Sequence, residues 1–268
     1  MPWLALTVEV ERAAAEAFSD ALLEAGAQSV ALEAGLISAV LELHQNPHSL
    51  VAAAAEAAGI APPRFSSARL EDEDWVRLSQ AQFTPVLIGE RLWVGPSWHQ
   101  APAGRIALRI DPGLAFGTGS HPSTRLVLRF LEQTMRGGER VLDYGCGSGI
   151  LAIAAAKLGA AHVDAVDLDP EAVETTRANA LANGVVLEAS LPEQLAPGVY
   201  DLVVSNILAA PLMVLAPLLA RHAGRIALSG ILETQADEVA SAYAPWFEMQ
   251  IGERAEGWGL LVGSRRCT

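Results

Sequence analysis

The sequence of 268 residues contains very little cysteine and few positive charges. Its two cysteines, Cys146 and Cys267, cannot form the framework of several disulfides that stabilises small secreted domains. Lysine and arginine number 18 against 31 aspartates and glutamates, which gives a formal net charge of −13. Because phosphate-driven binding needs a positive surface, we expect no direct nucleic-acid partner. An acidic surface is compatible with a basic protein partner.

Long hydrophobic runs are also missing. The longest, residues 207–220, is too short to span a bilayer and contains Pro211 and Pro217. The N-terminus shows no basic segment followed by an apolar one, as a secretory signal would. We therefore expect a cytoplasmic protein without a membrane partner. Hydrophobic residues make up 51% of the chain, enough for one large or two modest domain cores.

The first 70 residues predict a small α+β domain. Ala14, Phe18 and Leu22 have helical spacing, and Gly26 follows as a C-terminal cap. The predicted elements are a strand at 4–8, a helix at 11–25, a hairpin of strands at 29–33 and 36–43, a helix at 47–59 and a strand at 64–70. The order β-α-β-β-α-β is that of a ferredoxin-like domain.

Beyond residue 83 the chain predicts a second, larger domain. A hairpin of strands at 83–88 and 91–94 and a strand at 106–110 come first. We expect Trp93 and Trp98 to pack between this segment and the main sheet. From residue 140 onward strands and helices alternate, which predicts a parallel α/β sheet with helices on both faces. The predicted strands are 140–143, 162–167, 185–189, 200–205 and 225–229, the helices are 148–158, 170–182, 209–222 and 234–243, and an antiparallel pair at 247–252 and 259–262 completes a Rossmann-like, seven-stranded sheet.

A glycine turn after the first of these parallel strands predicts a nucleotide-binding site. Gly145, Gly147 and Gly149 permit positive φ and close approach of a ligand to the backbone. Their G-x-G-x-G spacing differs from the G-x-G-x-x-G of dinucleotide sites. Asp143, just before the turn, would repel a pyrophosphate but suits a ligand with a sulfonium and an ammonium, as in S-adenosylmethionine. The alternative is a turn that serves only tight strand–helix packing.

Two further side chains follow strands at the edge where ligands of open α/β sheets bind. Asp167 ends the second strand and can accept hydrogen bonds from a ribose diol. Asn206 ends the fourth strand, where its amide could touch the methionine part of the cofactor and an incoming amine. The alternative for Asn206 is a cap on the next helix.

The loop at residues 111–124 is rich in glycine, proline and hydroxyl side chains. Such a loop is suited to closing over a bound ligand, and we assign this role to Phe116, Gly117, Thr118 and Gly119. His121 could act as a base or metal ligand, although a structural hydrogen bond is the interpretation we favour. No cluster with metal-ligand spacing is present, so we predict no metal.

Four segments together resemble one family. The loop D-P-G-L-A-F-G-T-G-S-H-P-S-T at 111–124, the turn L-D-Y-G-C-G-S-G-I-L-A-I-A at 142–154, N-I-L-A at 206–209 and S-G-I-L at 229–232 are similar to the motifs of bacterial ribosomal protein L11 methyltransferases. Ser120 and Ser123 stand where threonine is usual, but both keep the hydroxyl. The resemblance is strong over residues 72–268 and extends to the N-terminal domain only in arrangement.

This resemblance implies a domain organisation and a set of cofactor contacts. A ferredoxin-like domain at 1–70 would grip the substrate, a helical linker at 71–85 would follow, and residues 86–268 would form the S-adenosylmethionine-dependent methyltransferase domain. The family's cofactor contacts match Thr124, Gly145, Asp167 and Asn206. The implied activity is repeated methylation of lysine side chains and the N-terminal amine of L11, with a neutral amine displacing the cofactor's sulfur.

The alternative function is a methyltransferase with another acceptor, such as a nucleobase, a glutamine amide or a small amine. Enzymes of planar amides and bases tend to carry Asn-Pro-Pro-aromatic after the fourth strand, where this chain has Asn-Ile-Leu-Ala. The charge also disfavours nucleic acid. A nicotinamide-dependent dehydrogenase is disfavoured by Asp143 and the glycine spacing, and a non-catalytic cofactor-binding module is a third alternative.

Overall fold

The computed structural model describes residues 3–10, 14–33, 36–42, 44–70, 84–111 and 119–266. The chain forms two compact units, residues 1–82 and 83–268. The predicted linker at 71–85 therefore lies almost wholly outside the described residues, as do Phe116, Gly117 and Thr118 of the predicted closing loop. Among the described helices, none combines the length and the apolar character that crossing a membrane requires.

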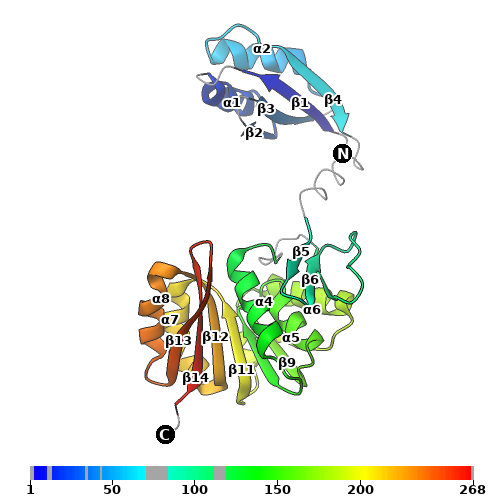
Figure 1. The fold of residues 1–268 in the computed structure, drawn as a ribbon. Coiled ribbons are helices and arrows are strands. Elements are labelled where there is room, and N and C mark those ends of the chain that lie inside the picture. The colour runs from blue at the N-terminus through cyan, green and yellow to red at the C-terminus, as the bar shows by residue number, and fades with distance from the viewer. Residues whose placement is uncertain are drawn as a thin grey trace. The chain divides into compact units, whose positions relative to one another are not determined.

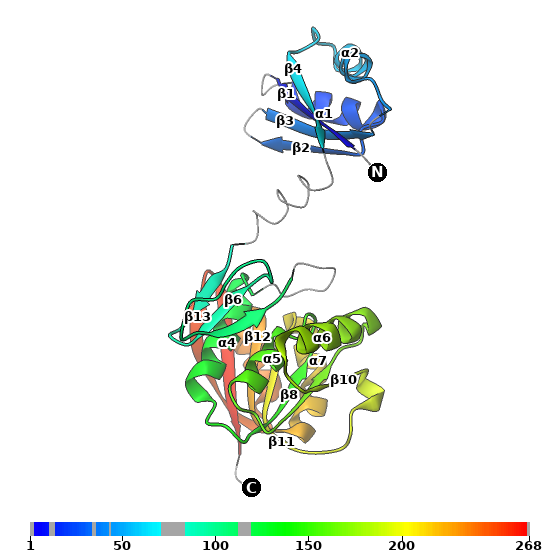
Figure 2. The same ribbon diagram turned by 90° about the vertical axis from the view of Figure 1, so that its right-hand side faces the viewer.

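The smaller unit is ferredoxin-like, as predicted (Figures 1 and 2). Its elements are β1 (Trp3–Glu9), α1 (Ala15–Glu24), β2 (Ser29–Glu33), β3 (Leu36–Glu42), α2 (Pro47–Ala57) and β4 (Phe65–Leu70). The strands form an antiparallel sheet in the order β2-β3-β1-β4. Phe18 and Leu22 of α1 and Val51 of α2 pack on Leu6 and Ile37 of the sheet, which gives this unit a hydrophobic core of its own.

The larger unit is built on a seven-stranded sheet in the order β10-β9-β8-β11-β12-β14-β13. The strands are β8 (Arg140–Tyr144), β9 (His162–Val166), β10 (Glu188–Ser190), β11 (Tyr200–Asn206), β12 (Ala223–Leu232), β13 (Phe247–Ala255) and β14 (Trp258–Arg265). The first five are parallel, and β14 inserts antiparallel between β12 and β13. The Rossmann-like prediction is confirmed.

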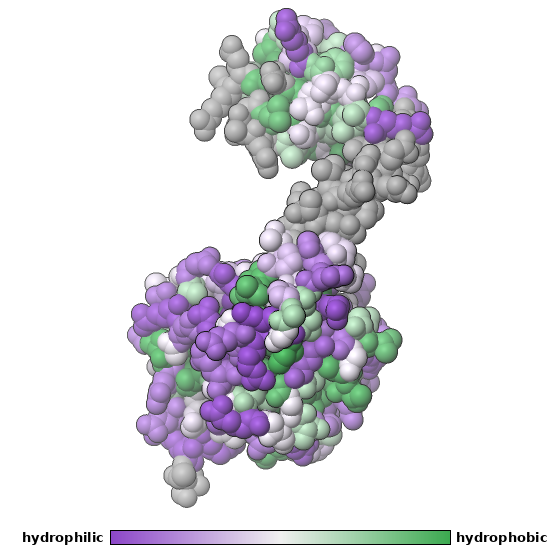
Figure 3. Space-filling model, turned by 45° about the vertical axis from the view of Figure 1, so that its right-hand side comes forward, coloured by the Kyte–Doolittle hydropathy of each residue, from purple (hydrophilic) through white to green (hydrophobic). Residues whose placement is uncertain are grey.

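Helices cover both faces of this sheet (Figure 1). They are α4 (Pro122–Thr134), α5 (Ile150–Lys157), α6 (Pro170–Asn183), α7 (Ala209–His222) and α8 (Ala236–Tyr243). α4, α5 and α6 share one hydrophobic cluster, whereas α7 and α8 belong to a second cluster on the opposite face. Hydrophilic side chains cover most of the face of this unit seen in Figure 3, in keeping with the formal net charge of −13.

A three-stranded sheet of β5 (Val86–Ile88), β6 (Leu92–Gly95) and β7 (Ile106–Arg109) packs against the first of these clusters. Asn183 at the end of α6 binds it, since its Oδ1 accepts from the Arg109 amide at 2.8 Å and its Nδ2 donates to the Arg109 carbonyl at 2.7 Å. Trp93 is buried as expected, but Trp98 is 38% exposed. The expectation that Trp98 packs inside was wrong, because its aromatic character alone gave no information about its direction.

Several strand boundaries also differ from the sequence prediction, and the antiparallel pair is longer than predicted, at 247–255 and 258–265. β10 begins at Glu188 instead of residue 185, because Gly184 ends α6 in a left-handed conformation and residues 185–187 lead away from it. β12 extends to Leu232 through an irregularity between Leu228 and Ile231. Gly230, with φ of +81°, lies in this irregularity, so the strand continues past the edge where the prediction ended it.

Candidate functional site

The glycine turn connects β8 to α5 at the carboxyl edge of the sheet. Gly145, Gly147 and Gly149 have φ of +82°, +55° and +78°, a region that favours glycine. A Cβ on Gly145 would lie 2.5 Å from Cγ2 of Ile207, and one on Gly149 would lie 2.8 Å from Cγ2 of Thr176. The turn therefore has the positive φ angles that let a ligand approach the backbone, and it also has the tight packing of the alternative interpretation.

Asp167 follows β9 and is held by two backbone amides. Its Oδ2 accepts from the Gly147 amide at 2.9 Å, and its Oδ1 accepts from the Asp169 amide at 3.0 Å. The residue is only partly buried. Because each carboxylate oxygen can accept a second hydrogen bond, this arrangement leaves both oxygens with acceptor capacity in a fixed orientation beside the glycine turn.

Asp143 lies beneath the turn and is fully buried. Its Oδ2 accepts from the Ala152 amide in the first turn of α5 at 3.0 Å, a role that Gly149 at the N-cap cannot perform. No hydrogen-bond partner of its Oδ1 is found among the described residues. The pKa of Asp143 is raised to about 7, chiefly by burial and further by the charge of Asp167, while the hydrogen bond from the Ala152 amide acts to lower it. Near neutral pH this carboxyl is thus poised between its two protonation states.

Asn206 ends β11 and is joined to α4. Its Nδ2 donates to the hydroxyl of Thr124 at 3.0 Å, while its Oδ1 is buried and has no partner in the described part of the chain. The N-cap of α7 is Leu208, which makes no side-chain capping bond. The alternative in which Asn206 caps this helix is therefore wrong. Thr124 is itself fully buried, so its hydroxyl lies behind the amide of Asn206.

A cavity of about 540 Å³ opens in front of Asn206. Apolar side chains form most of its wall, and the lining residues are His121, Ser123, Asn206, Ile207, Leu208, Pro211, Gly230 and Trp258. Since Ile207 also touches the place where a Cβ of Gly145 would lie, the cavity adjoins the glycine turn. The Asn206 amide is thus a hydrogen-bonding group in a mostly apolar wall, which suits a ligand with an apolar body and a polar end.

Sequence reasoning missed most of this wall. The segments at 206–209 and 229–232 were noted as motifs, but nothing in them indicated that Ile207, Leu208 and Gly230 would border one cavity. Trp258 lies far from both in the sequence, and its only signal was its aromatic ring. Its position depends on β14 inserting beside β12, where Trp258 pairs with Leu232.

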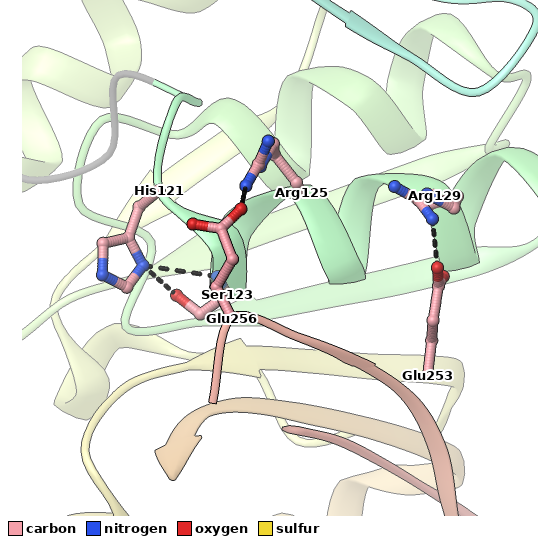
Figure 4. A network of polar contacts seen from close by, with 6 residues as sticks. All are labelled: His121, Ser123, Arg125, Arg129, Glu253 and Glu256. Atoms are coloured by element: carbon pink, nitrogen blue, oxygen red, sulfur yellow. Dashed lines mark hydrogen bonds and ion pairs between the residues drawn. The ribbon is translucent and has the colours of Figure 1, made fainter. Parts of the chain in front are cut away.

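His121 is the N-cap of α4 (Figure 4). Its Nδ1 accepts from the Ser123 amide at 3.3 Å and lies 2.7 Å from the Ser123 hydroxyl. Its ring meets that of Trp258 edge to face, with centroids 4.7 Å apart. These contacts agree with the structural hydrogen bond that the sequence analysis favoured, and they place an aromatic pair in the cavity wall.

Gly119 is the described member of the predicted closing loop. It is buried and has φ of +85°. A Cβ there would lie 2.5 Å from Cγ1 of Val94 and 2.8 Å from Cδ1 of Ile150. Gly119 therefore packs between β6 and the start of α5, next to the glycine turn.

Comparison with known proteins gives consistent matches along the chain. The family described as ribosomal protein L11 methyltransferase matches residues 2–266. A relative of that name from Thiobacillus denitrificans is 49% identical over 296 residues, covering 99% of this chain and 100% of the relative. The crystal structure of a ribosomal protein L11 methylase from Lactobacillus delbrueckii subsp. bulgaricus is 36% identical with a TM-score of 0.63, covering 68% of this chain and 99% of that one.

A more distant solved structure shares the fold alone. It is a 16S rRNA N2 G1207 methyltransferase of T. Thermophilus in complex with AdoMet and guanosine. Its identity to this chain is 18% and its TM-score is 0.52, over 89% of this chain and 58% of that chain. The likeness supports the Rossmann-like architecture and says nothing of the acceptor.

Proposed function

Because this chain belongs to the ribosomal protein L11 methyltransferase family and is a methyltransferase enzyme, we propose that it transfers methyl groups from S-adenosylmethionine to lysine side chains and the N-terminal amine of L11. The observation that carries this proposal is the place of Asn206, which lines an apolar cavity beside the glycine turn and is held there by the Thr124 hydroxyl. An enzyme that modifies a ribosomal protein acts where ribosomes assemble, so we place it in the cytoplasm.

The residues at the sheet edge fit the proposed cofactor. Asp167 has two oriented acceptor oxygens for the ribose hydroxyls, and the backbone of Gly145, Gly147 and Gly149 permits close approach. Oδ1 of Asp143 has no partner among the residues that the structure describes, and its pKa lies near neutrality, so a cation nearby would favour the ionised form. When bound, the cofactor supplies a methyl group made electrophilic by its sulfonium.

Thr124 was matched to a cofactor contact by resemblance. Its full burial and its bond to Asn206 favour an indirect role, in which Thr124 orients Asn206. Gly119, packed on Val94 and Ile150, would anchor one end of the closing loop, and Phe116, Gly117 and Thr118 would cover the bound cofactor and amine.

The protein's part in the reaction is to position and desolvate the amine. A lysine amine has an ordinary pKa near 10.4 and must lose a proton before it can act as a nucleophile. The apolar walls of the cavity lower that pKa by desolvation. Asn206 Oδ1 accepts an N–H of the neutral amine and so directs its lone pair. No dedicated base is required, and Nδ1 of His121 is already bonded to Ser123.

The test is mass analysis of intact L11 after incubation with the enzyme and S-adenosylmethionine. We expect added methyl groups with wild-type enzyme and almost none with Asn206→Ala. Transfer to rRNA, a glutamine amide or a free small amine, with L11 left unmodified, would contradict the proposal and favour another acceptor.

A further inference from the structure

Helix α4 and the hairpin of β13 and β14 are joined by two ion pairs. Arg125 pairs with Glu256, and Arg129, one helical turn later, pairs with Glu253 (Figure 4). Both arginines project from α4 and both glutamates belong to the hairpin. The two pairs have the same chemistry, but the Arg125 pair is nearer to the cavity, because Arg125 is next to Thr124 in sequence and Glu256 is two residues from Trp258.

Glu256 has an unusual backbone conformation. Its φ is +52°, and it is the one non-glycine residue with positive φ in the part of the chain that the structure describes. Gly257 follows with φ of +81°, and Ala255 pairs directly with Trp258 across the turn. Two-residue hairpin turns of this kind favour Asn-Gly or Asp-Gly. A glutamate is therefore a poor choice for the backbone alone, which indicates a role for its side chain.

The turn delivers Trp258 to the cavity wall. Trp258 is the first residue of β14, and its ring meets that of His121, the N-cap of α4. The start of α4 thus takes part in three contacts. His121 and Ser123 line the cavity, Thr124 accepts a hydrogen bond from Asn206, and Arg125 forms the ion pair with Glu256. Any shift of the hairpin relative to α4 would move Trp258 away from the other wall residues.

We propose that Glu256 is a positioning residue, which acts through its ion pair with Arg125 to hold Trp258 as the wall that packs on the alkyl stem of the substrate amine. This inference rests on the proposed function, since it assigns the wall to an amine substrate. An aromatic wall excludes water from the stem and its π face tolerates the positive charge that the amine carries after transfer.

The variant Glu256→Asn tests this role, because asparagine suits the left-handed conformation and cannot pair with Arg125. We expect the KM for L11 to rise roughly two- to fivefold, as fits the loss of a partly exposed ion pair. The kcat, the Kd for S-adenosylmethionine and the melting temperature should not fall. The matched control is Glu253→Gln, which breaks the neighbouring pair and should leave the KM unchanged.

A double-mutant cycle with Trp258→Leu tests whether Glu256 acts through Trp258. In the Trp258→Leu background, Glu256→Asn should have no further effect on the KM. An unchanged KM in Glu256→Asn, an equal change in Glu253→Gln, or additive effects in the cycle would each overturn the inference. If Trp258→Leu does not fold, the comparison of Glu256→Asn with Glu253→Gln decides. Wild-type enzyme that leaves L11 unmodified would overturn the proposed function, and this inference with it.

Discussion

The side-chain nitrogen of Asn206 donates to the hydroxyl of Thr124 at 3.0 Å, joining the end of β11 to the first turn of α4. Thr124 is fully buried, whereas Asn206 lines the cavity. The bond therefore fixes the side-chain amide of Asn206, which we propose orients the substrate, relative to α4. The buried Oδ1 of Asn206 has no hydrogen-bond partner within the described ranges.

We predict that Thr124→Val lowers kcat about tenfold, because Asn206 loses the bond that fixes its orientation and positioning accounts for effects of this size. Thr124→Ser keeps the hydroxyl and serves as the control. The measurements are kcat and KM for L11, together with calorimetry of S-adenosylmethionine binding. A loss of cofactor affinity as large as the loss of kcat would instead indicate direct contact between Thr124 and the cofactor.

Asp167→Ala should weaken S-adenosylmethionine binding at least about tenfold, because two hydrogen bonds to a charged acceptor are lost. Asp169→Asn is the control, since Asp169 caps α6 through the Glu171 amide and asparagine is an equally good cap. Calorimetry on both variants measures the affinity. Equal binding by Asp167→Ala and wild type would remove Asp167 from the proposed ribose site.

The sequence could predict those site residues whose positions follow from a neighbouring strand, but not contacts between residues far apart in the chain. The glycine turn, Asp167 and Asn206 each follow a strand whose pattern was clear, so topology alone brought them to one sheet edge. The pairing of Thr124 with Asn206 was not predictable, because it joins residues far apart in the chain. The same holds for Trp258, which reaches the cavity only because β14 inserts antiparallel beside β12.

The fold was predicted well where hydrophobic periodicity was strong. The parallel strands and the ferredoxin-like order were confirmed, and the errors lay at ends of elements set by tertiary contacts. β12 was predicted too short because Gly230 has no side chain to signal that the strand continues; a Cβ there would lie 2.4 Å from the Ile207 carbonyl oxygen. The burial of Asp143 could also not be predicted, because the sequence pattern around an aspartate at the end of a strand is the same whether its side chain faces a ligand or a helix amide.

Asp143 should make stability depend on pH. Its pKa is about 7 in the folded protein and near 3.8 when unfolded. Between these values the unfolded chain has released a proton that the folded chain retains, so the free energy of unfolding falls as pH rises. The contribution of Asp143 to the free energy of unfolding is fully present below about pH 4 and is lost by about pH 7. The loss over this range amounts to roughly 4 kcal/mol.

The variant Asp143→Asn keeps an acceptor for the Ala152 amide but does not titrate. Its stability relative to wild type should therefore increase as pH rises from about 4 to 7 and then level off. Urea unfolding of both proteins across this range measures the difference, in which the other titrating groups cancel. A difference that stays constant with pH would mean that Asp143 does not carry the shifted proton.

The two units should fold independently of one another. Each has a hydrophobic core of its own, since the cluster of the smaller unit shares no residue with the two clusters of the larger one. A fragment of residues 83–268 should therefore fold and bind S-adenosylmethionine with the affinity of the full chain, because every proposed cofactor contact lies within it.

We propose that the smaller unit grips L11, so the fragment should lose most methylation of L11. A short lysine peptide, which does not depend on that grip, should be methylated equally slowly by both proteins. Calorimetry and intact-mass analysis test these outcomes. Full activity of the fragment on L11 would show that substrate recognition resides in the cavity and its rim, and would leave the ferredoxin-like unit without the role assigned to it.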